Sequence, residues 1–362
     1  MIKWRYITSE CESVSTALAT DEYLMTRYDN WTESDFPEPV LRIYTMKSPC
    51  VLIGRFQNPE AEVNLEECRR LSIPVNRRMT GGGAVVMGEQ QLMVSIPCSV
   101  EHPLIPAHPA RILPKLARGI INGLSLLGIE AEYRPKNDIV VNGRKIGGSA
   151  ICIEKTGAFL YQASVLVDFD IPLMMQVLNI HPEKASDKGE ISYDNRLTTI
   201  TRELNASVSL SRAREAICRG FEQAFKISAV HAPFNDTEME WIHAIDVGKY
   251  STPEWINQRI PANDMRGEFV MKTPAGLIHT YAALSGDTIK SVLITGDFFS
   301  DDRHIKDIEA ALKWGRSDRE SITRTIRVVM ADKVDSIYGL SAEELGFAVF
   351  NAAANARLVD IP

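Results

Sequence analysis

The order of apolar and polar positions predicts strands mixed with helices in the first part of the chain. Residues 2–8 alternate as in a half-buried strand, and short apolar runs predict further strands at 41–44, 50–53 and 73–75. Apolar residues recur at helical spacing from about residue 14 to 28, and a shorter helix is predicted at 63–71.

The middle of the chain predicts antiparallel strands around one hairpin. Residues 136–150 contain a β-branched run, the dipeptide Asn142-Gly143 and a second strand. Asn-Gly between two such runs is the strongest short signal for a hairpin. Further strands are predicted at 91–97, 129–133, 151–153 and 158–167, and helices at 116–127, 171–178 and 208–226.

A change in composition predicts a second domain. Prolines and polar residues punctuate 228–262, so we place a boundary near residue 245. Beyond it the pattern predicts strands at 267–271, 276–283 and 289–295, followed by helices at 302–313, 318–330 and 341–354. The expected organisation is a first domain of residues 1–245 and a small α+β second domain of residues 246–362.

Composition narrows the class of protein. The chain has 362 residues, a net charge of −7 and a pI near 5.6. That balance argues against a nucleic-acid-binding protein or an anionic-membrane surface. No apolar run reaches the length of about 18 residues expected of a membrane span, and residues 1–6 lack the apolar core of a signal peptide. The six cysteines show no metal-binding spacing, which fits a reducing cytoplasm.

A glycine-rich stretch is the first candidate site. Arg77 and Arg78 lie just before Gly81, Gly82 and Gly83, and an apolar run follows. Consecutive glycines suit a backbone that curves tightly or approaches a ligand, and cations beside them favour an anion. We expect a phosphate or acyl-phosphate site with both arginines supplying charge. A tight loop between strands, flanked by solvated arginines, is the alternative.

The hairpin carries the second candidate site. Lys145 lies just before the small residues 147–150, where a lysine can reach a phosphate or carboxylate oxygen. Asp138, on the paired strand, is expected to bind Mg²⁺ or to balance the lysine. A solvated lysine and a turn aspartate are the alternatives. Cys152 is the best-placed cysteine for a nucleophile, but this stretch has no histidine to activate it.

Three motifs together resemble one family. They are residues 54–59 (Gly-Arg-Phe-Gln-Asn-Pro), residues 77–85 (Arg-Arg-Met-Thr-Gly-Gly-Gly-Ala-Val) and residues 136–150, from Lys-Asn-Asp to Gly-Arg-Lys-Ile-Gly-Gly-Ser-Ala. Their order and spacing resemble the lipoate–protein ligase A family. The resemblance continues at 184–197, and at 249–255 and 294–299 it extends to the accessory domain of the long bacterial form. It implies an α+β fold with mixed and antiparallel sheets, like the catalytic domain of class II biotin ligases.

The resemblance implies a two-step, ATP-dependent reaction in the cytoplasm. Lipoate attacks the α-phosphate of ATP, and a lysine of a lipoyl carrier domain then attacks the acyl-adenylate. The carrier is expected to be of the 2-oxoacid dehydrogenase (E2) or glycine-cleavage H protein type. Lys145 is the expected catalytic residue, and Asp138 the expected Mg²⁺ ligand. The residues expected to bind substrate or adenylate are Arg78, Thr80, Gly81, Gly82, Gly83, Ala84, Val85, Asn137, Gly148, Ser149, Ala150, Gln162 and Ser164.

Physical chemistry adds two expectations to this resemblance. A reactive adenylate needs protection from water, for which residues 184–188 are a candidate loop. An apolar acyl tail needs a greasy tunnel, which we expect around Val85, Val86 and Ile146.

The sequence departs from the family at three places. Val86-Met87-Gly88 replaces an aromatic-His-Asp string, residues 161–164 (Tyr-Gln-Ala-Ser) replace His-His-Gly-Thr, and Gln90 or Gln91 replaces an asparagine. With these changes the substrate could be lipoate, octanoate or another short acyl acid. One alternative is an amidotransferase that moves the acyl group between carriers without ATP. Relatives of that kind that use a cysteine carry it just before the hairpin, and residues 132–136 have none. Another alternative is a catalytically weak carrier-binding homologue.

Overall fold

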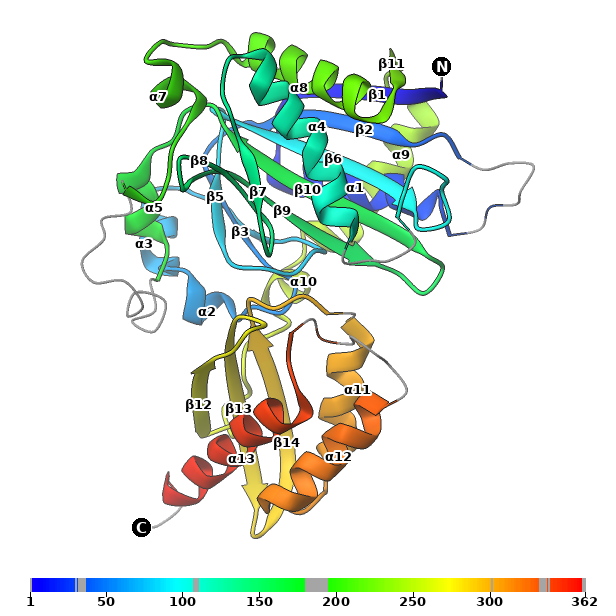
Figure 1. The fold of residues 1–362 in the computed structure, drawn as a ribbon. Helices are drawn as coiled ribbons and strands as arrows, with labels where there is room; N and C mark the ends of the chain where they lie inside the picture. The colour runs from blue at the N-terminus through cyan, green and yellow to red at the C-terminus, as the bar shows by residue number, and fades with distance from the viewer. Residues whose placement is uncertain are drawn as a thin grey trace.

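Three β-sheets and their helices form the two lobes of the molecule (Figure 1). The computed structural model describes residues 2–29, 31, 37–106, 111–179, 195–300, 302–331, 337 and 339–359. In one lobe the large sheet has the strand order β11-β1-β2-β6-β10-β9-β8-β7, beside a small sheet β4-β3-β5. The other lobe contains the sheet β12-β13-β14. The predicted α+β class is confirmed.

Parallel and antiparallel pairs are combined in the large sheet. β1 runs parallel to β11 and β2, and the remaining pairs are antiparallel. Its strands are β1 (Ile2–Glu12), β2 (Val40–Met46), β6 (Gln91–Ser99), β7 (Glu132–Arg134), β8 (Asp138–Val141), β9 (Arg144–Ile153), β10 (Ala158–Leu166) and β11 (Ile227–His231). The small sheet contains β3 (Cys50–Ile53), β4 (Val75–Arg77) and β5 (Val85–Met87).

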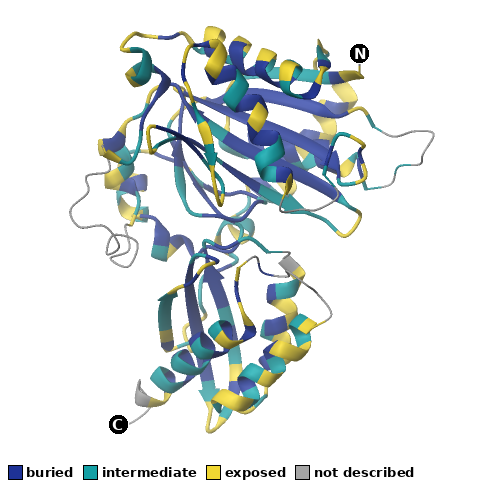
Figure 2. Ribbon diagram, in the orientation of Figure 1, coloured by how far each residue is buried: buried dark blue, intermediate teal, exposed yellow. Residues whose placement is uncertain are grey.

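Two helices cover one face of the large sheet, and a third packs on the opposite face. α4 (Ile112–Leu126) and α8 (Leu210–Phe225) pack on each other and share the largest apolar core with strands β2, β6 and β10. α1 (Val14–Thr26) contacts the same strands. Side chains of β2 alternate between the two faces of the sheet. Leu41 and Ile43 pack in the α4/α8 core, while the Arg42 side chain hydrogen-bonds to α1 on the opposite face. Figure 2 shows the central strands buried and the outer helix faces exposed.

The predicted hairpin is present between β8 and β9. Asn142 and Gly143 have φ values of 51° and 78°. Two consecutive positive φ values are characteristic of the type I′ turn, whose twist matches that of the flanking strands. The turn therefore pairs Val140 with Lys145, and a register shift between Val140 and Ile139 places Asp138 opposite Gly148.

The second lobe follows the predicted order of elements. Its strands β12 (Gly267–Lys272), β13 (Leu277–Ser285) and β14 (Thr288–Gly296) precede helices α11 (Asp302–Leu312), α12 (Arg319–Ala331) and α13 (Ala342–Val359). Before it come α9 (Asp236–Ile245), a π-helix at Asp246–Tyr250 and α10 (Pro253–Asn257). Tyr250 and Trp255 still pack with the apolar cluster of α1 and β3. The domain division near residue 245 stays a prediction.

Short helices complete the first lobe. They are α2 (Pro59–Glu62), α3 (Leu65–Arg70), α5 (Ile171–Val177) and α7 (Ile200–Leu204). Within the described part of the chain, every helix is too short or too polar to cross a bilayer.

Candidate active site

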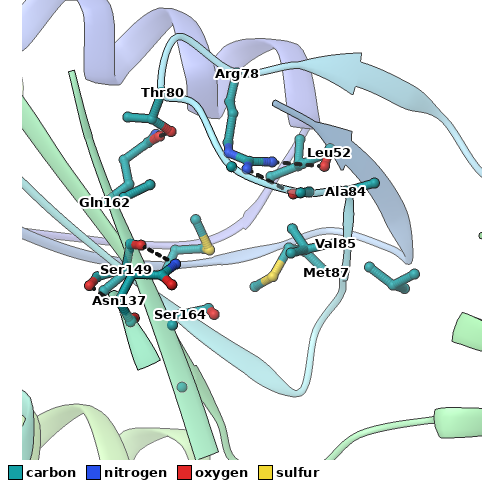
Figure 3. Close-up of a pocket in the computed structure, with 18 of the residues that line it drawn as sticks. Leu52, Arg78, Thr80, Ala84, Val85, Met87, Asn137, Ser149, Gln162 and Ser164 are labelled. Carbon is teal, nitrogen blue, oxygen red and sulfur yellow. Dashed lines mark hydrogen bonds between the residues drawn. The ribbon is translucent and has the colours of Figure 1, made fainter. Parts of the chain in front are cut away.

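A cavity of about 270 Å³ lies between the glycine-rich loop and the large sheet. The loop at 80–84 and strands β3 and β5 line one side, and strands β6, β9 and β10 line the other. Figure 3 shows these side chains converging. The structure brings together the predicted residues Arg78, Thr80, Gly81, Gly82, Gly83, Ala84, Val85, Asn137, Lys145, Gly148, Ser149, Ala150, Gln162 and Ser164. Their chemical roles stay predictions.

Arg78 holds the glycine-rich loop in its curve. Its guanidinium donates to the carbonyl oxygen of Leu52 at 2.9 Å and to those of Gly81 and Gly83 at 2.8 Å (Figure 3). Burial lowers the pKa of Arg78 to about 10, so the group stays charged at neutral pH. Among the described residues it has no carboxylate in ion-pair contact. A buried cation paired only with neutral carbonyls favours negative charge on a ligand beside it.

Arg77 has a different task from the one expected. Its fully buried side chain donates to the carbonyls of Gly54, Arg55 and Gln57, and to those of Trp255 and Ile256 in α10. Arg77 is absent from the cavity wall. The expectation that it supplies charge to a ligand is wrong, because all of these bonds join the 54–57 turn to α10.

The second lobe closes tightly against the glycine-rich loop. The ring of Phe298 stacks on that of Phe56 with centroids 4.9 Å apart. A Cβ atom built at Gly81 would collide with the backbone oxygen of Phe298. At Gly83 a Cβ would meet Asp297 at 3.9 Å, which is an ordinary contact. The triple glycine therefore serves close approach of two backbones at Gly81, and not equally at all three positions.

Gly81→Ala is expected to lower the free energy of unfolding by about 1–3 kcal/mol, because the added methyl group overpacks this contact. Gly83→Ala, the matched control, is expected to change it by less than about 0.5 kcal/mol, because its site has room. Denaturant unfolding of both variants measures the difference. Equal stability of the two variants would show that the contact with the second lobe is loose.

Lys145 faces the cavity from β9 with a fixed anionic partner. Its Nζ lies 2.7 Å from Oδ1 of Asp138, and Arg134 donates to Oδ2 at 2.9 Å. Burial alone would raise the pKa of Asp138, but the charges of Lys145 and Arg134 outweigh it and lower that pKa below its usual value. Asp138 therefore stays ionised and orients Lys145 toward the cavity.

Magnesium has no ready ligand set around Asp138. Both of its carboxylate oxygens already contact cations, and the described residues contain no group of three metal-ligating side chains. Mg²⁺ strongly prefers oxygen ligands in octahedral geometry. This arrangement around Asp138 does not fit a resident Mg²⁺ ion. Binding of Mg²⁺ elsewhere on the protein stays a prediction.

A polar chain links the loop to the buried interior. Thr80 donates to Oε1 of Gln162 at 2.9 Å, and Gln162 donates from Nε2 to Asp21 at 2.7 Å. Asp21 also pairs with Arg42, at 2.5 Å. Gln162 occupies one of the positions where the family resemblance leads one to expect a histidine, and it fixes the loop through Thr80. Asp21 and Arg42 escaped the sequence reasoning, although charges inside an apolar helix and strand pattern were a usable signal.

Asn137 is held across the hairpin. Its Nδ2 donates to the carbonyl of Ser149 at 2.8 Å, and the Ser149 N–H donates to the Asn137 carbonyl at 2.8 Å (Figure 3). This double contact fixes the edge of the cavity next to Lys145.

The opposite part of the cavity wall is apolar. It includes Leu52, Val85, Val86, Met87, Met93, Leu166, Phe169 and Met174. Val85 and Val86 were expected here, but Ile146 was not confirmed, because it faces the α4/α8 core on the other side of the sheet. The remaining residues come from several elements far apart in sequence. No local pattern assembles them, so sequence reasoning missed them.

No cysteine lines the cavity. All six cysteines belong to the described residues, and none is among those that form the wall. Cys152 packs with Met25 and Leu160, and burial raises the pKa of its thiol to about 12. A thiol with that pKa stays protonated near neutral pH and is a poor nucleophile. Residues 184–188, the expected covering loop, lie outside the described residues.

The fold and this cavity place the protein in the class of protein acyl ligases and acyltransferases. The chain belongs to the lipoyl protein ligase A/B catalytic domain family, whose model matches residues 13–222. The resemblance seen in the three motifs is confirmed.

Similar proteins of known structure and curated name refine this assignment. Octanoyltransferase LipM of Brevibacillus brevis is 28% identical over 278 residues, covering 70% of this chain and 99% of its own length. Octanoyltransferase LipM of Carboxydothermus hydrogenoformans is 29% identical over 272 residues, covering 71% and 99%. The bipartite lipoate protein ligase of Thermoplasma acidophilum is 28% identical, with a TM-score of 0.62 over 73% of this chain and 99% of that one.

The curated names correct the expected reaction. We expected an ATP-dependent lipoate–protein ligase, but the curated relatives that align over nearly their whole length are octanoyltransferases. The ligase expectation is therefore wrong as the main function, and the transferase alternative is favoured.

Proposed function

We propose that this protein transfers an octanoyl or similar short acyl group from a carrier-protein thioester to a lysine of a lipoyl domain, without ATP. The observation that carries the proposal is the cavity, whose apolar wall ends at Lys145 and Asn137, in a chain whose curated relatives are octanoyltransferases. The acceptor domain would be of the 2-oxoacid dehydrogenase (E2) or glycine-cleavage H protein type.

The reaction needs no adenylate because a thioester is already activated. The neutral ε-amine of the acceptor lysine attacks the thioester carbonyl carbon and forms the new C–N bond. Negative charge then develops on the carbonyl oxygen. The C–S bond breaks, the amine nitrogen loses a proton, and the carrier thiolate takes up a proton as it leaves. A fixed cation aimed at the developing oxyanion lowers the barrier of such a step.

Lys145 has the properties that this step requires. Its ammonium faces the cavity and is held by Asp138, so it needs no reorientation as the charge develops. Arg78 adds a second positive charge at the wall and holds the glycine-rich loop in place. The apolar wall takes the acyl chain out of water, which orients the carbonyl toward these groups.

The absence of a cysteine from the cavity supports direct transfer from donor to acceptor. An acyl-enzyme route would need a thiolate at the carbonyl carbon, and the thiol of Cys152 packs among apolar residues instead. The proposed reaction therefore forms no covalent acyl-enzyme on cysteine.

The test uses the full chain, an octanoyl carrier-protein thioester and a lipoyl domain, in EDTA and without nucleotide. Mass spectrometry of the lipoyl domain is expected to show octanoylation of its lysine. A parallel reaction supplies free octanoate with Mg·ATP in place of the thioester. Acylation only in that second reaction, with release of pyrophosphate, would overturn the proposal.

Cys152→Ser is expected to leave the transfer rate within about twofold of the unchanged protein, because the thiol does not reach the cavity. Intact-mass measurement during turnover is expected to show no acyl adduct on the enzyme. A thioester-linked adduct that disappears in the Cys152→Ser variant, together with loss of transfer, would contradict direct transfer.

A further inference from the structure

A second cavity lies directly behind the apolar end of the first one. Its volume is about 320 Å³, and the two cavities have Val86, Met87 and Phe169 in common. These three residues therefore lie between the two cavities and form the partition between them. Val86 and Met87 belong to β5, and Phe169 lies between β10 and α5.

The two cavities differ in chemical character. The wall of the first is apolar near the partition, with Leu52, Met93 and Leu166. The lining of the second is more polar, and its acidic residues Glu89, Asp168 and Asp170 are exposed to solvent. An apolar chain therefore has a favourable environment up to the partition, and a path toward water beyond it.

Hydrogen bonds of the neighbouring backbone hold Met87 and Phe169 in position. Met87 is 1% exposed and pairs with Cys50 across β5 and β3. The Phe169 N–H donates to Oδ1 of Asp168 at 2.8 Å, and Asp170 caps α5 by accepting from the Leu173 N–H at 2.9 Å. A methionine side chain is flexible and fills irregular gaps, so Met87 is suited to close the apolar end of the first cavity.

We propose that Met87 and Phe169 set the maximum acyl length, by closing the cavity behind an octanoyl-sized chain. This inference rests on the proposed function, since it assigns the donor chain to the apolar end of the same cavity. It also gives a role to the position where Val86-Met87-Gly88 replaces the aromatic-His-Asp string of the family. Removal of either side chain joins the two cavities, and a longer chain then passes the partition.

The experiment compares octanoyl, decanoyl, dodecanoyl and tetradecanoyl thioesters as donors for Met87→Ala and Phe169→Ala. Each added methylene that becomes buried is expected to improve kcat/KM by about fourfold, which corresponds to about 0.8 kcal/mol. The dodecanoyl-to-octanoyl ratio of kcat/KM is therefore expected to rise at least tenfold in either variant. Leu173→Ala is the matched control, because Leu173 lines only the second cavity and its loss leaves the partition intact.

A binding measurement separates this inference from the proposed function. Calorimetry with free octanoate, decanoate and dodecanoate is expected to show the same shift toward longer chains, whether or not the protein transfers them. Thermal unfolding of each variant confirms that it is folded, and Phe169→Ala, at a half-buried position, serves if Met87→Ala does not fold. An unchanged chain-length profile in a folded variant overturns the partition. Absence of transfer from every thioester by the unchanged protein overturns the proposed function instead.

Discussion

Lys145→Ala is expected to lower kcat for acyl transfer by about 10²–10³-fold, the cost of removing one preorganised donor at a developing oxyanion. The side chain of Lys145 is about one-third exposed and packs in no apolar cluster, so its loss leaves the folded core intact. The variant is therefore expected to unfold at nearly the same temperature as the unchanged protein. Single-turnover transfer to a lipoyl domain measures the chemical step directly.

Lys145→Arg tests whether the positive charge alone is sufficient for activity. A guanidinium keeps the positive charge but distributes its donors in a planar fork, so recovery of part of the rate is expected. Asp138→Asn removes the partner that orients the lysine and is expected to lower kcat by a smaller factor, with little change in KM. Full activity of Lys145→Ala would show that this lysine only balances Asp138.

The sequence was sufficient where local patterns determine structure. The Asn142-Gly143 turn fixed the hairpin and placed Lys145 opposite Val140, because a type I′ turn sets the register of the adjoining strand residues. The order of strands and helices in the second lobe followed from alternation and spacing alone. The residues of the glycine-rich loop and the hairpin meet in one cavity, as the three motifs predicted.

The sequence was insufficient where segments distant in the chain combine. β11 pairs in parallel with β1, more than two hundred residues earlier, and its residues lie in a region that prolines made look irregular. The apolar cavity wall draws on Leu52, Met93, Leu166 and Met174 from four different elements. Arg77 was interpreted as a ligand-binding cation because the sequence alone does not show that backbone carbonyls accept its hydrogen bonds. The correction of the reaction type depended on curated relatives that align over nearly their own whole length, since ligases and transferases share this fold.

The second large effect is expected on stability, from substitutions among the buried charges behind the glycine-rich loop. Arg42 is completely buried and bonds to Asp21 and Glu12, and its Nη1 also donates to the Ala17 carbonyl at 2.9 Å. Burial opposes the charge of Arg42, but the neighbouring carboxylates Glu12 and Asp21 outweigh it and raise its pKa. Loss of one partner leaves part of a buried charge uncompensated, which is strongly destabilising.

Asp21→Ala is expected to lower the free energy of unfolding by about 3 kcal/mol, the low end for a broken buried ion pair, because Glu12 still contacts Arg42. Denaturant unfolding measures this change. Glu343→Ala is the control, because its ion pair with Arg327 is exposed on both sides and its loss is expected to leave stability nearly unchanged. If both substitutions lowered the free energy of unfolding equally, the buried ion pair would contribute no more to stability than an exposed one.

The same substitution reaches the site through Gln162. Without Asp21, the amide of Gln162 loses its acceptor, and its bond to Thr80 no longer fixes the glycine-rich loop. The variant is therefore expected to lose transfer activity at temperatures where it is still folded. Gln162→Leu separates the two effects, because it removes the bond to Thr80 while Asp21 keeps its ion pair with Arg42. If Asp21→Ala retained full transfer at low temperature, the network would stabilise the fold without positioning the loop.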